Sequence, residues 1–324
     1  MPDSTLFILV IVLAVGFAVI NGFNDAANAI ATVVSTRSLS PLRAVIMASI
    51  LNFAGAATGT AVVFFFGLNI IKEGVLNYDM MIAALGTVII WGVVATYRGL
   101  PISISHAFIA GLVGAGIAIG GVDAIIWSGP YKALSAAAIA PALGFAGGLS
   151  VMIALMWLLR RRAPLRVEGI FSRLQILSAA FMSYAHGKND GQMPIAIIAM
   201  ALVIHTGNEF QVPFWVIALS AGSISLGTLF GGWRVIRTVG FKITALRPVH
   251  GFAAMSSAAT VVEIASAFGI PVSTTHCISS SIMGVGATKR LSAVRWGVAG
   301  NIVLAWILTF PICGIIGWVL GSIF

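Results

Sequence analysis

The octapeptide GLPISISH at residues 99–106 recurs in closely similar form as GIPVSTTH at residues 269–276. Each copy is followed, after seven further residues, by Gly-x-Gly. A shorter motif, Gly-x-Asn-Asp, precedes both copies as GFND at 22–25 and GKND at 187–190. The two motifs therefore stand in the same order at offsets of 170 and 165 residues. Because self-similarity of this kind marks a duplicated architecture, we interpret the chain as two structural repeats.

The composition around these motifs is that of a membrane protein. Of the 324 residues, 59% are apolar and 8% are charged, whereas a soluble domain carries about 25% charge. The mean hydropathy is +1.06 and the pI is near 10.3. No clustered basic face accompanies this pI, so the composition excludes a nucleic-acid binder together with soluble enzymes and disordered chains. The apolar runs do not alternate with polar residues as barrel strands do. We therefore predict an all-α polytopic membrane protein with about 10–12 membrane segments.

The apolar runs form two sets of five on either side of a basic linker. They lie near 6–36, 44–67, 80–97, 102–120 and 133–159, and then 174–206, 213–233, 250–268, 272–288 and 296–322. We predict three regions from this pattern: a first repeat at 1–159, a linker at 160–173 and a second repeat at 174–324.

The basic residues predict the orientation of these repeats. Arg37, Arg43, the linker and the stretches 234–247 and 289–295 are rich in basic residues and should face the cytoplasm. The breaks at 68–79, 121–132 and 207–212 are poor in them and should face outside. The second repeat then has the same elements in opposite orientation, as in inverted-repeat transporters. Both termini are predicted outside, in a multi-pass protein of the inner or plasma membrane.

The Gly-x-Asn-Asp motifs predict cation sites. The run 6–36 has 31 residues, about 46 Å as a straight helix, and exceeds a hydrocarbon core of about 30 Å. We therefore predict a break near Gly22–Asp25 that makes two half-helices, with the Asn and Asp side chains capping the second one. Carboxylate and amide oxygens also suit a hard cation such as sodium.

The Pro-x-Ser-x-[Ser/Thr]-His motifs predict oxyanion sites. Each lies between two apolar runs, which favours a pair of re-entrant-like hairpin tips. Proline fits the first turn of a helix, and the hydroxyls and free N–H groups that follow can bind an anion. Cation ligands beside anion ligands predict a cation-coupled oxyanion symporter.

At these residues the chain resembles the inorganic phosphate transporter (PiT) family, with Asn24-Asp25-Ala26-Ala27-Asn28 fitting its pattern closely. The resemblance covers both halves and implies an inverted-repeat fold, a homodimer, and phosphate uptake driven by sodium or protons. It implies that Asn24, Asp25, Asn189 and Asp190 serve the coupling ions. It further implies phosphate binding by Ser103, Ser105, Ser273, Thr274 and Thr275. The two half-sites are not equivalent, because Phe23 corresponds to Lys188 and Asn28 to Met193.

Because charged residues are rare in this chain, those within the apolar runs are further candidates for ion or substrate binding. Of the nine acids, Asp25, Asp190 and Glu263 are predicted at membrane depth, where acids are functional by default. Glu263 is a candidate for a cation or proton site, and Asn28 and Gln192 are candidate cation ligands. Lys188 could neutralise Asp190 or contact the anion, and Asp25 or Asp190 could also reach a protonated phosphate. The remaining acids, Glu73 among them, fall in predicted ends, loops or the linker.

The sequence is compatible with three functions. The first is import of inorganic phosphate by symport with sodium ions. The second keeps the fold but transports sulfate, or couples phosphate to protons. The third is an anion channel, which would need a continuous pore instead of two closing tips. An enzyme is not expected, since no nucleophile and base accompany the acids. We expect no tightly bound cofactor and no nucleic-acid partner; sodium, phosphate and membrane lipid are the expected partners.

Overall fold

The computed structural model describes residues 3–59, 61–72 and 74–324, and Glu73 lies outside them. The described chain is nearly all helical. The first half contains α1 (Asp3–Ser35), α2 (Pro41–Thr58), α3 (Ala61–Leu68), α4 (Tyr78–Arg98), α5 (Ile104–Gly120), the short turn η1 (Val122–Ala124) and α6 (Ser128–Leu159). The second half contains α7 (Pro164–Asp190), α8 (Gln192–Thr206), α9 (Phe214–Phe230), α10 (Trp233–Arg237), η2 (Thr238–Lys242), α11 (Pro248–Ala267), α12 (Thr274–Ala287), η3 (Leu291–Ala293) and α13 (Trp296–Gly321).

Several of these helices are long and apolar enough to cross a membrane. In the described residues these are α1, α2, α4, α6 and α13, and α9 with α10 and η2 makes a sixth span bent by 58°. The bend falls at Gly231 and Gly232, between the two helices. The chain is thus an integral, multi-pass membrane protein with one sharply broken helix in its described part.

The helix α1 is continuous where the sequence predicts a break. Its 33 residues run through Gly22–Asp25 without interruption, about 50 Å in length. The reason lies in the side chains, because Asn24 and Asp25 bond to Thr96 and Thr275 on other helices instead of capping their own. In the second copy α7 ends at Asp190, and a single glycine, Gly191, separates it from α8.

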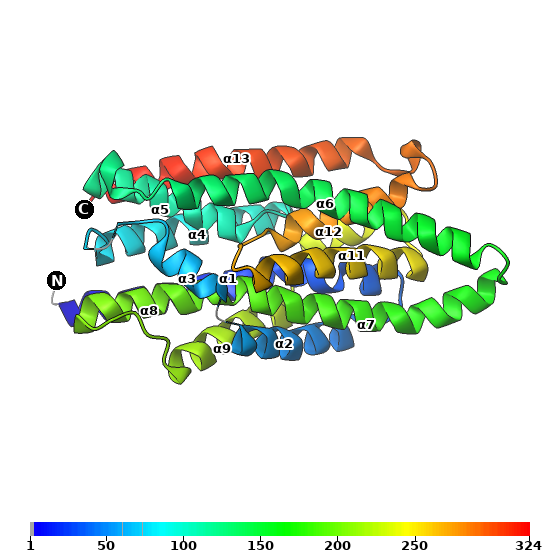
Figure 1. Ribbon diagram of the computed structural model, residues 1–324, viewed down its shortest axis with the longest axis horizontal. Helices are drawn as coiled ribbons and strands as arrows, with labels where there is room; N and C mark the ends of the chain where they lie inside the picture. The colour runs from blue at the N-terminus through cyan, green and yellow to red at the C-terminus, as the bar shows by residue number, and fades with distance from the viewer. Residues whose placement is uncertain (1–2, 60, 73) are drawn as a thin grey trace.

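Two helical hairpins are built in the same way at their tips. Gly99 and Gly269 end α4 and the α11 segment with φ of +69° and +67°, a left-handed conformation that glycine adopts without a steric cost. Ser103 and Ser273 then cap α5 and α12 by accepting hydrogen bonds from the backbone N–H groups of the histidines three residues on. The α4–α5 hairpin comes from the end of the molecule that holds both termini, and α11–α12 comes from the opposite end (Figure 1).

The tips of the two hairpins meet inside the protein. The ring centroids of His106 and His276 lie 5.2 Å apart, and both side chains are buried. The ring of Trp306 in α13 packs against His276 at a tilt, with centroids 4.1 Å apart, and its indole N–H donates to the Pro101 carbonyl at 2.8 Å. The histidines therefore support the tip-to-tip contact.

Helices of the first half pack closely against helices of the second. The closest approaches between the halves are at glycines, where an added Cβ atom would lie 1.9–2.2 Å from a backbone carbonyl oxygen. Small residues allow such close crossings in membrane proteins. The contacts come in corresponding pairs: Gly22 against Ile224 and Gly187 against Asn52, Gly227 against Val19 and Gly55 against Tyr184, Gly114 against Gly314 and Gly284 against Phe145.

The chain termini and the connection between the two halves lie at opposite ends of the molecule. The N- and C-terminal ends of the chain lie together at one end, and the connection between α6 and α7 lies at the other (Figure 1). The predicted topology requires this arrangement. Which end faces the cytoplasm stays a prediction.

Candidate ion and oxyanion site

Two carboxylates from the two Asn-Asp motifs meet at one histidine. The Nε2 atom of His186 lies 3.0 Å from Asp190 Oδ2 and 3.6 Å from Asp25 Oδ2. Ligand atoms of all three side chains lie within 4.8 Å of one another. Each of the three side chains is at most 3% exposed. Carboxylates this close together in a buried place repel one another, and a bound cation or a hydrogen-bond donor relieves that repulsion.

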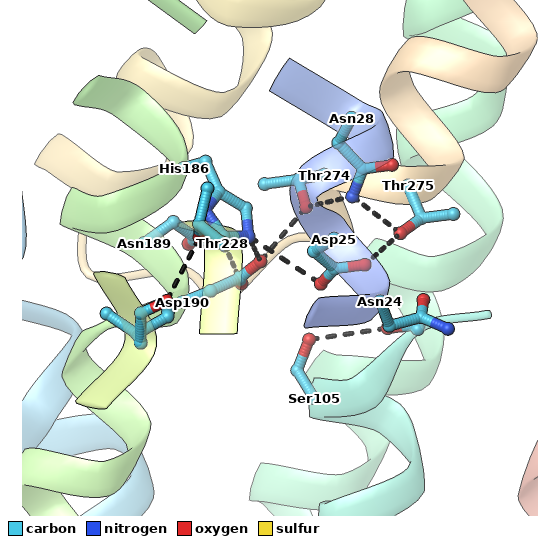
Figure 2. Close-up of polar contacts among 12 residues, drawn as sticks. Asn24, Asp25, Asn28, Ser105, His186, Asn189, Asp190, Thr228, Thr274 and Thr275 are labelled. Carbon is cyan, nitrogen blue, oxygen red and sulfur yellow. Dashed lines mark hydrogen bonds and ion pairs between the residues drawn. The ribbon is translucent and has the colours of Figure 1, made fainter. Parts of the chain in front are cut away.

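The second hairpin tip contacts both carboxylates through adjacent threonines. Thr275 donates its hydroxyl to Asp25 Oδ1 at 3.0 Å, and Thr274 donates to Asp190 Oδ2 at 2.9 Å. Asn28 of α1 donates to both threonine oxygens, at 2.8 and 3.1 Å. Figure 2 shows these side chains as one connected network around His186. The first turn of α12 thus lies directly against the paired acids.

On the side of the ring opposite the acids, Asn52 contacts His186, and Thr228 in turn contacts Asn52. Its Nδ1 atom lies 2.9 Å from Asn52 Oδ1, and Asn52 donates its amide to Thr228 at 2.7 Å. His186, Asn52 and Thr228 all lie outside the duplicated motifs of the sequence. A usable signal existed for His186, because it stands four residues before Asp190 on the same helical face. A comparison of the two copies does not reveal this histidine, because the corresponding position in the first copy is Asn21.

The asparagines of the two motifs make equivalent contacts. Asn24 donates to Thr96 at 2.7 Å, and Asn189 accepts from Ser266 at 3.2 Å. Thr96 and Ser266 stand at the same position, three residues before the glycine of each tip. Asn189 also donates to the Val272 carbonyl in the second tip at 2.7 Å. Each asparagine therefore ties its own motif to the neighbouring hairpin.

Among the candidate cation ligands, three amide oxygens are buried without a hydrogen-bond partner in the described part of the chain. These are Asn24 Oδ1, Asn28 Oδ1 and Gln192 Oε1. The amide nitrogens of the same residues are bonded, with Gln192 donating to the Ala56 carbonyl at 3.1 Å. Buried polar atoms are rarely left unpaired unless an ion or a water completes them. Carbonyl-type oxygens together with carboxylates are the donor set that a sodium ion prefers.

Other predicted site residues lie apart from the paired acids. Ser103 and Ser105 of the first tip contact each other at 3.3 Å, and both are buried. Ser273 is the cap of α12, with its oxygen 3.1 Å from the His276 N–H. Lys188 forms an ion pair with Glu263 instead of with Asp190. The structure therefore brings the second tip, but not the first, onto the carboxylates.

A large apolar groove lies beside this network. It has a volume of about 970 Å³, is bounded by α3, α6 and α11, and reaches the second tip at Pro271 and Val272. Asp25 and Asp190 are 2% exposed each, so the groove does not open onto them. The site is closed to solvent in this conformation.

This interior of buried acids and helix-tip hydroxyls in a multi-pass helical protein is typical of a membrane transport protein. The phosphate transporter family model matches residues 21–317 of the chain. The chain belongs to the phosphate transporter family.

Relatives and a solved structure agree with this assignment. A protein of Rhizobium meliloti (strain 1021), named "Probable low-affinity inorganic phosphate transporter", is 45% identical over 96% of this chain and 94% of its own length. A protein of Bacillus subtilis (strain 168) with the same name is 40% identical over 96% and 95%. A solved structure named "The sodium-dependent phosphate transporter" matches with a TM-score of 0.87 and 26% identity, covering 98% of each chain. The expectation that the protein is a transporter and not an enzyme is confirmed by its family.

Proposed function

We propose that the protein imports inorganic phosphate by symport with sodium ions. The observation that carries this proposal is the buried pair Asp25 and Asp190. Asn24, Asn28 and Gln192 stand within three positions of these acids in the sequence, and their amide oxygens have no partner in the described chain. This donor set suits sodium. The structural neighbour is named as sodium-dependent, which supports the same choice of ion.

The second hairpin tip supplies the oxyanion side of the proposed site. Thr274 and Thr275 would release the carboxylates and donate their hydroxyls to phosphate oxygens, with backbone N–H groups at the start of α12 as further donors. Both hydroxyls now lie within 3.0 Å of a carboxylate oxygen. An anion at this tip would therefore also reach a carboxylate acceptor. Protonated phosphate carries an O–H that can donate to it, and sulfate does not, so the arrangement favours phosphate.

Electrostatics gives the proposed coupling its physical cause. Without cations, two buried carboxylates repel an incoming anion. Sodium bound at Asp25 and Asp190 would cancel that repulsion, so each ligand raises the affinity for the other. Sodium would thus bind before or together with phosphate, and the empty or fully loaded site would be free to change its exposure.

We further propose that residues 1–159 and 174–324 are inverted repeats joined by the linker 160–173. The corresponding glycine contacts and the equivalent hairpin tips support this. Alternating access would follow from movement of the hairpins relative to the helices that carry the Asn-Asp motifs. In this proposal the end that holds the basic α6–α7 connection, which we call the basic end, faces the cytoplasm of a plasma or inner membrane. The chain assembles as a homodimer.

Uptake of labelled phosphate into proteoliposomes tests the proposed function. We expect accumulation that requires an inward sodium gradient and that excess sulfate does not inhibit. A pH gradient in place of the sodium gradient should give no accumulation. Phosphate uptake that proceeds equally without sodium would overturn the coupling, and sulfate uptake that phosphate does not inhibit would overturn the substrate.

A further inference from the structure

One ion pair lies next to the proposed site without being part of its network. Lys188 of α7 and Glu263 of α11 form this pair, with side chains 22% and 27% exposed. Lys188 directly precedes Asn189, and Glu263 stands one helical turn before Ser266, the partner of Asn189. The ion pair therefore lies beside the Asn189–Ser266 contact, between the same two helices.

The first half of the chain has the same framework without the charges. The Asn24–Thr96 contact corresponds to Asn189–Ser266. Beside it, Phe23 occupies the position of Lys188, and Val93 occupies the position of Glu263. The charged pair is thus an addition to one half-site, and neither residue is needed for the helix contact itself.

A carboxylate at membrane depth needs a compensating positive charge. For Asp25 and Asp190 a mobile cation can provide it, but Glu263 already has the ammonium group of Lys188 in contact. A sodium ion at the same carboxylate would be repelled by that ammonium. The second oxygen, Glu263 Oε2, is buried and has no partner in the described chain, so this atom could bind sodium only if the pair opened.

We propose that Lys188 is a tethered counter-cation for Glu263, so that this acid takes no coupling sodium and Lys188 does not bind phosphate. The proposal rests on the sodium–phosphate symport above and refines it, because it removes one acid from the sodium sites and one base from the phosphate site. The number of sodium ions carried per phosphate is then set at the site of Asp25 and Asp190, without a contribution from Glu263.

Removing the charges singly and together tests this assignment in the reconstituted protein. The variants are Lys188→Met, Glu263→Gln and the double variant, and the measurements are the sodium half-saturation, the phosphate KM and the amount of folded protein. Removing one partner of a partly buried pair leaves the other charge uncompensated. We therefore expect Lys188→Met to lower uptake about tenfold or more at the sodium concentration that half-saturates the wild type, with partial recovery at high sodium, since sodium must then neutralise Glu263.

The double variant distinguishes an internal ion pair from direct binding of phosphate by Lys188 or of sodium by Glu263. It leaves no unpaired charge, so it remains informative even if a single variant fails to fold. We expect its sodium half-saturation and phosphate KM to lie within about twofold of the wild type, because the two substitutions compensate each other. Arg247→Gln with Glu168→Gln removes an exposed ion pair with a 3.9 Å separation and provides the matched control, which should change neither value.

Two results would overturn the proposal. A phosphate KM that stays raised in the double variant would make Lys188 an anion ligand. A sodium half-saturation that stays raised would make Glu263 a sodium ligand. Failure of the symport itself would look different, because the wild type and all variants would then share an uptake that does not depend on sodium.

Discussion

Asn28 shows how one side chain connects the two halves of the site. Its amide nitrogen donates to the hydroxyl oxygens of Thr274 and Thr275. Each hydroxyl then has its own proton available as a donor, and these protons go to Asp190 and Asp25. The orientation of both hydroxyls is therefore set by a residue of the first helix, although both belong to the second hairpin.

Neutralising either buried acid should abolish coupled transport. We expect Asp25→Asn and Asp190→Asn to lower sodium-dependent phosphate uptake at least about a hundredfold, since each removes a full charge from the proposed sodium site in a buried place. Uptake at saturating phosphate in proteoliposomes, normalised to reconstituted protein, is the measurement. Near-normal sodium dependence in either variant would contradict the proposed role.

Removing the free oxygen of Asn28 should weaken sodium more than phosphate. Asn28→Leu keeps the volume but loses both the unpaired Oδ1 and the amide donor. We expect the sodium half-saturation to rise about tenfold, the effect of losing one good oxygen ligand worth about 1.4 kcal/mol. Asn301→Leu, at an exposed position of α13, is the matched control. A rise confined to the phosphate KM would assign Asn28 to the anion instead.

For individual residues, the sequence predicts the two buried acids better than it predicts the side chains that contact them. Asp25 and Asp190 are marked by the duplicated motif and by their depth in apolar runs. His186 is not, because its counterpart in the first copy is an asparagine. The unequal positions of Ser105 and Thr275 relative to the acids also escape prediction, since they depend on how each hairpin tilts against α1 and α7, and a single sequence does not encode that tilt locally.

The helices themselves follow the apolar runs closely. The ten predicted runs correspond to described helices or to pairs of adjacent helices, and both hairpins fall where the Gly-x-Pro motifs predict them. The exception is α1, where Asn24 and Asp25 predict a break that does not form. Local propensity indicates a cap there, but the tertiary partners of both side chains satisfy them in a continuous helix.

The glycine crossings should be intolerant of even one methyl group. A Cβ at Gly55 would lie 2.1 Å from the Tyr184 carbonyl oxygen, whereas a Cβ at Gly222 would meet nothing within 4 Å. We expect Gly55→Ala to destabilise the protein by about 3 kcal/mol. The same change at Gly222 should stabilise it by about 0.5–1 kcal/mol through helix propensity. Thermal unfolding of the detergent-solubilised variants measures both, and equal effects at the two sites would contradict the close crossing.

The serine caps of the two tips should contribute equally to the stability of the protein. Their contributions to phosphate transport should differ. Ser103→Ala and Ser273→Ala each remove an oxygen that accepts a backbone N–H, which costs about 1 kcal/mol. Because the second tip contacts the paired acids, we expect a raised phosphate KM for Ser273→Ala and a smaller change for Ser103→Ala. Thermal stability and phosphate KM measured side by side separate the two effects, and a larger KM change at Ser103 would shift the anion to the first tip.

The orientation of the whole molecule is open to a labelling experiment. Cys277 and Cys313 are fully buried, so a cysteine introduced at an exposed site is the one that an impermeant maleimide should reach. We expect Val122→Cys to be labelled in intact cells, and Arg166→Cys to be labelled after permeabilisation, because the basic end should face the cytoplasm. The reverse pattern would invert the predicted topology while leaving the site unchanged.

The interlocked packing of the two halves has a consequence for biosynthesis. During translation α1, α5 and α6 leave the ribosome well before α9, α13 and α12, the helices whose backbones they later contact. The early helices must therefore wait in the bilayer with their glycine faces against lipid until the later ones arrive. Assembly of the nascent chain is then a late event, and a product that stops after α6 is a ready substrate for quality control.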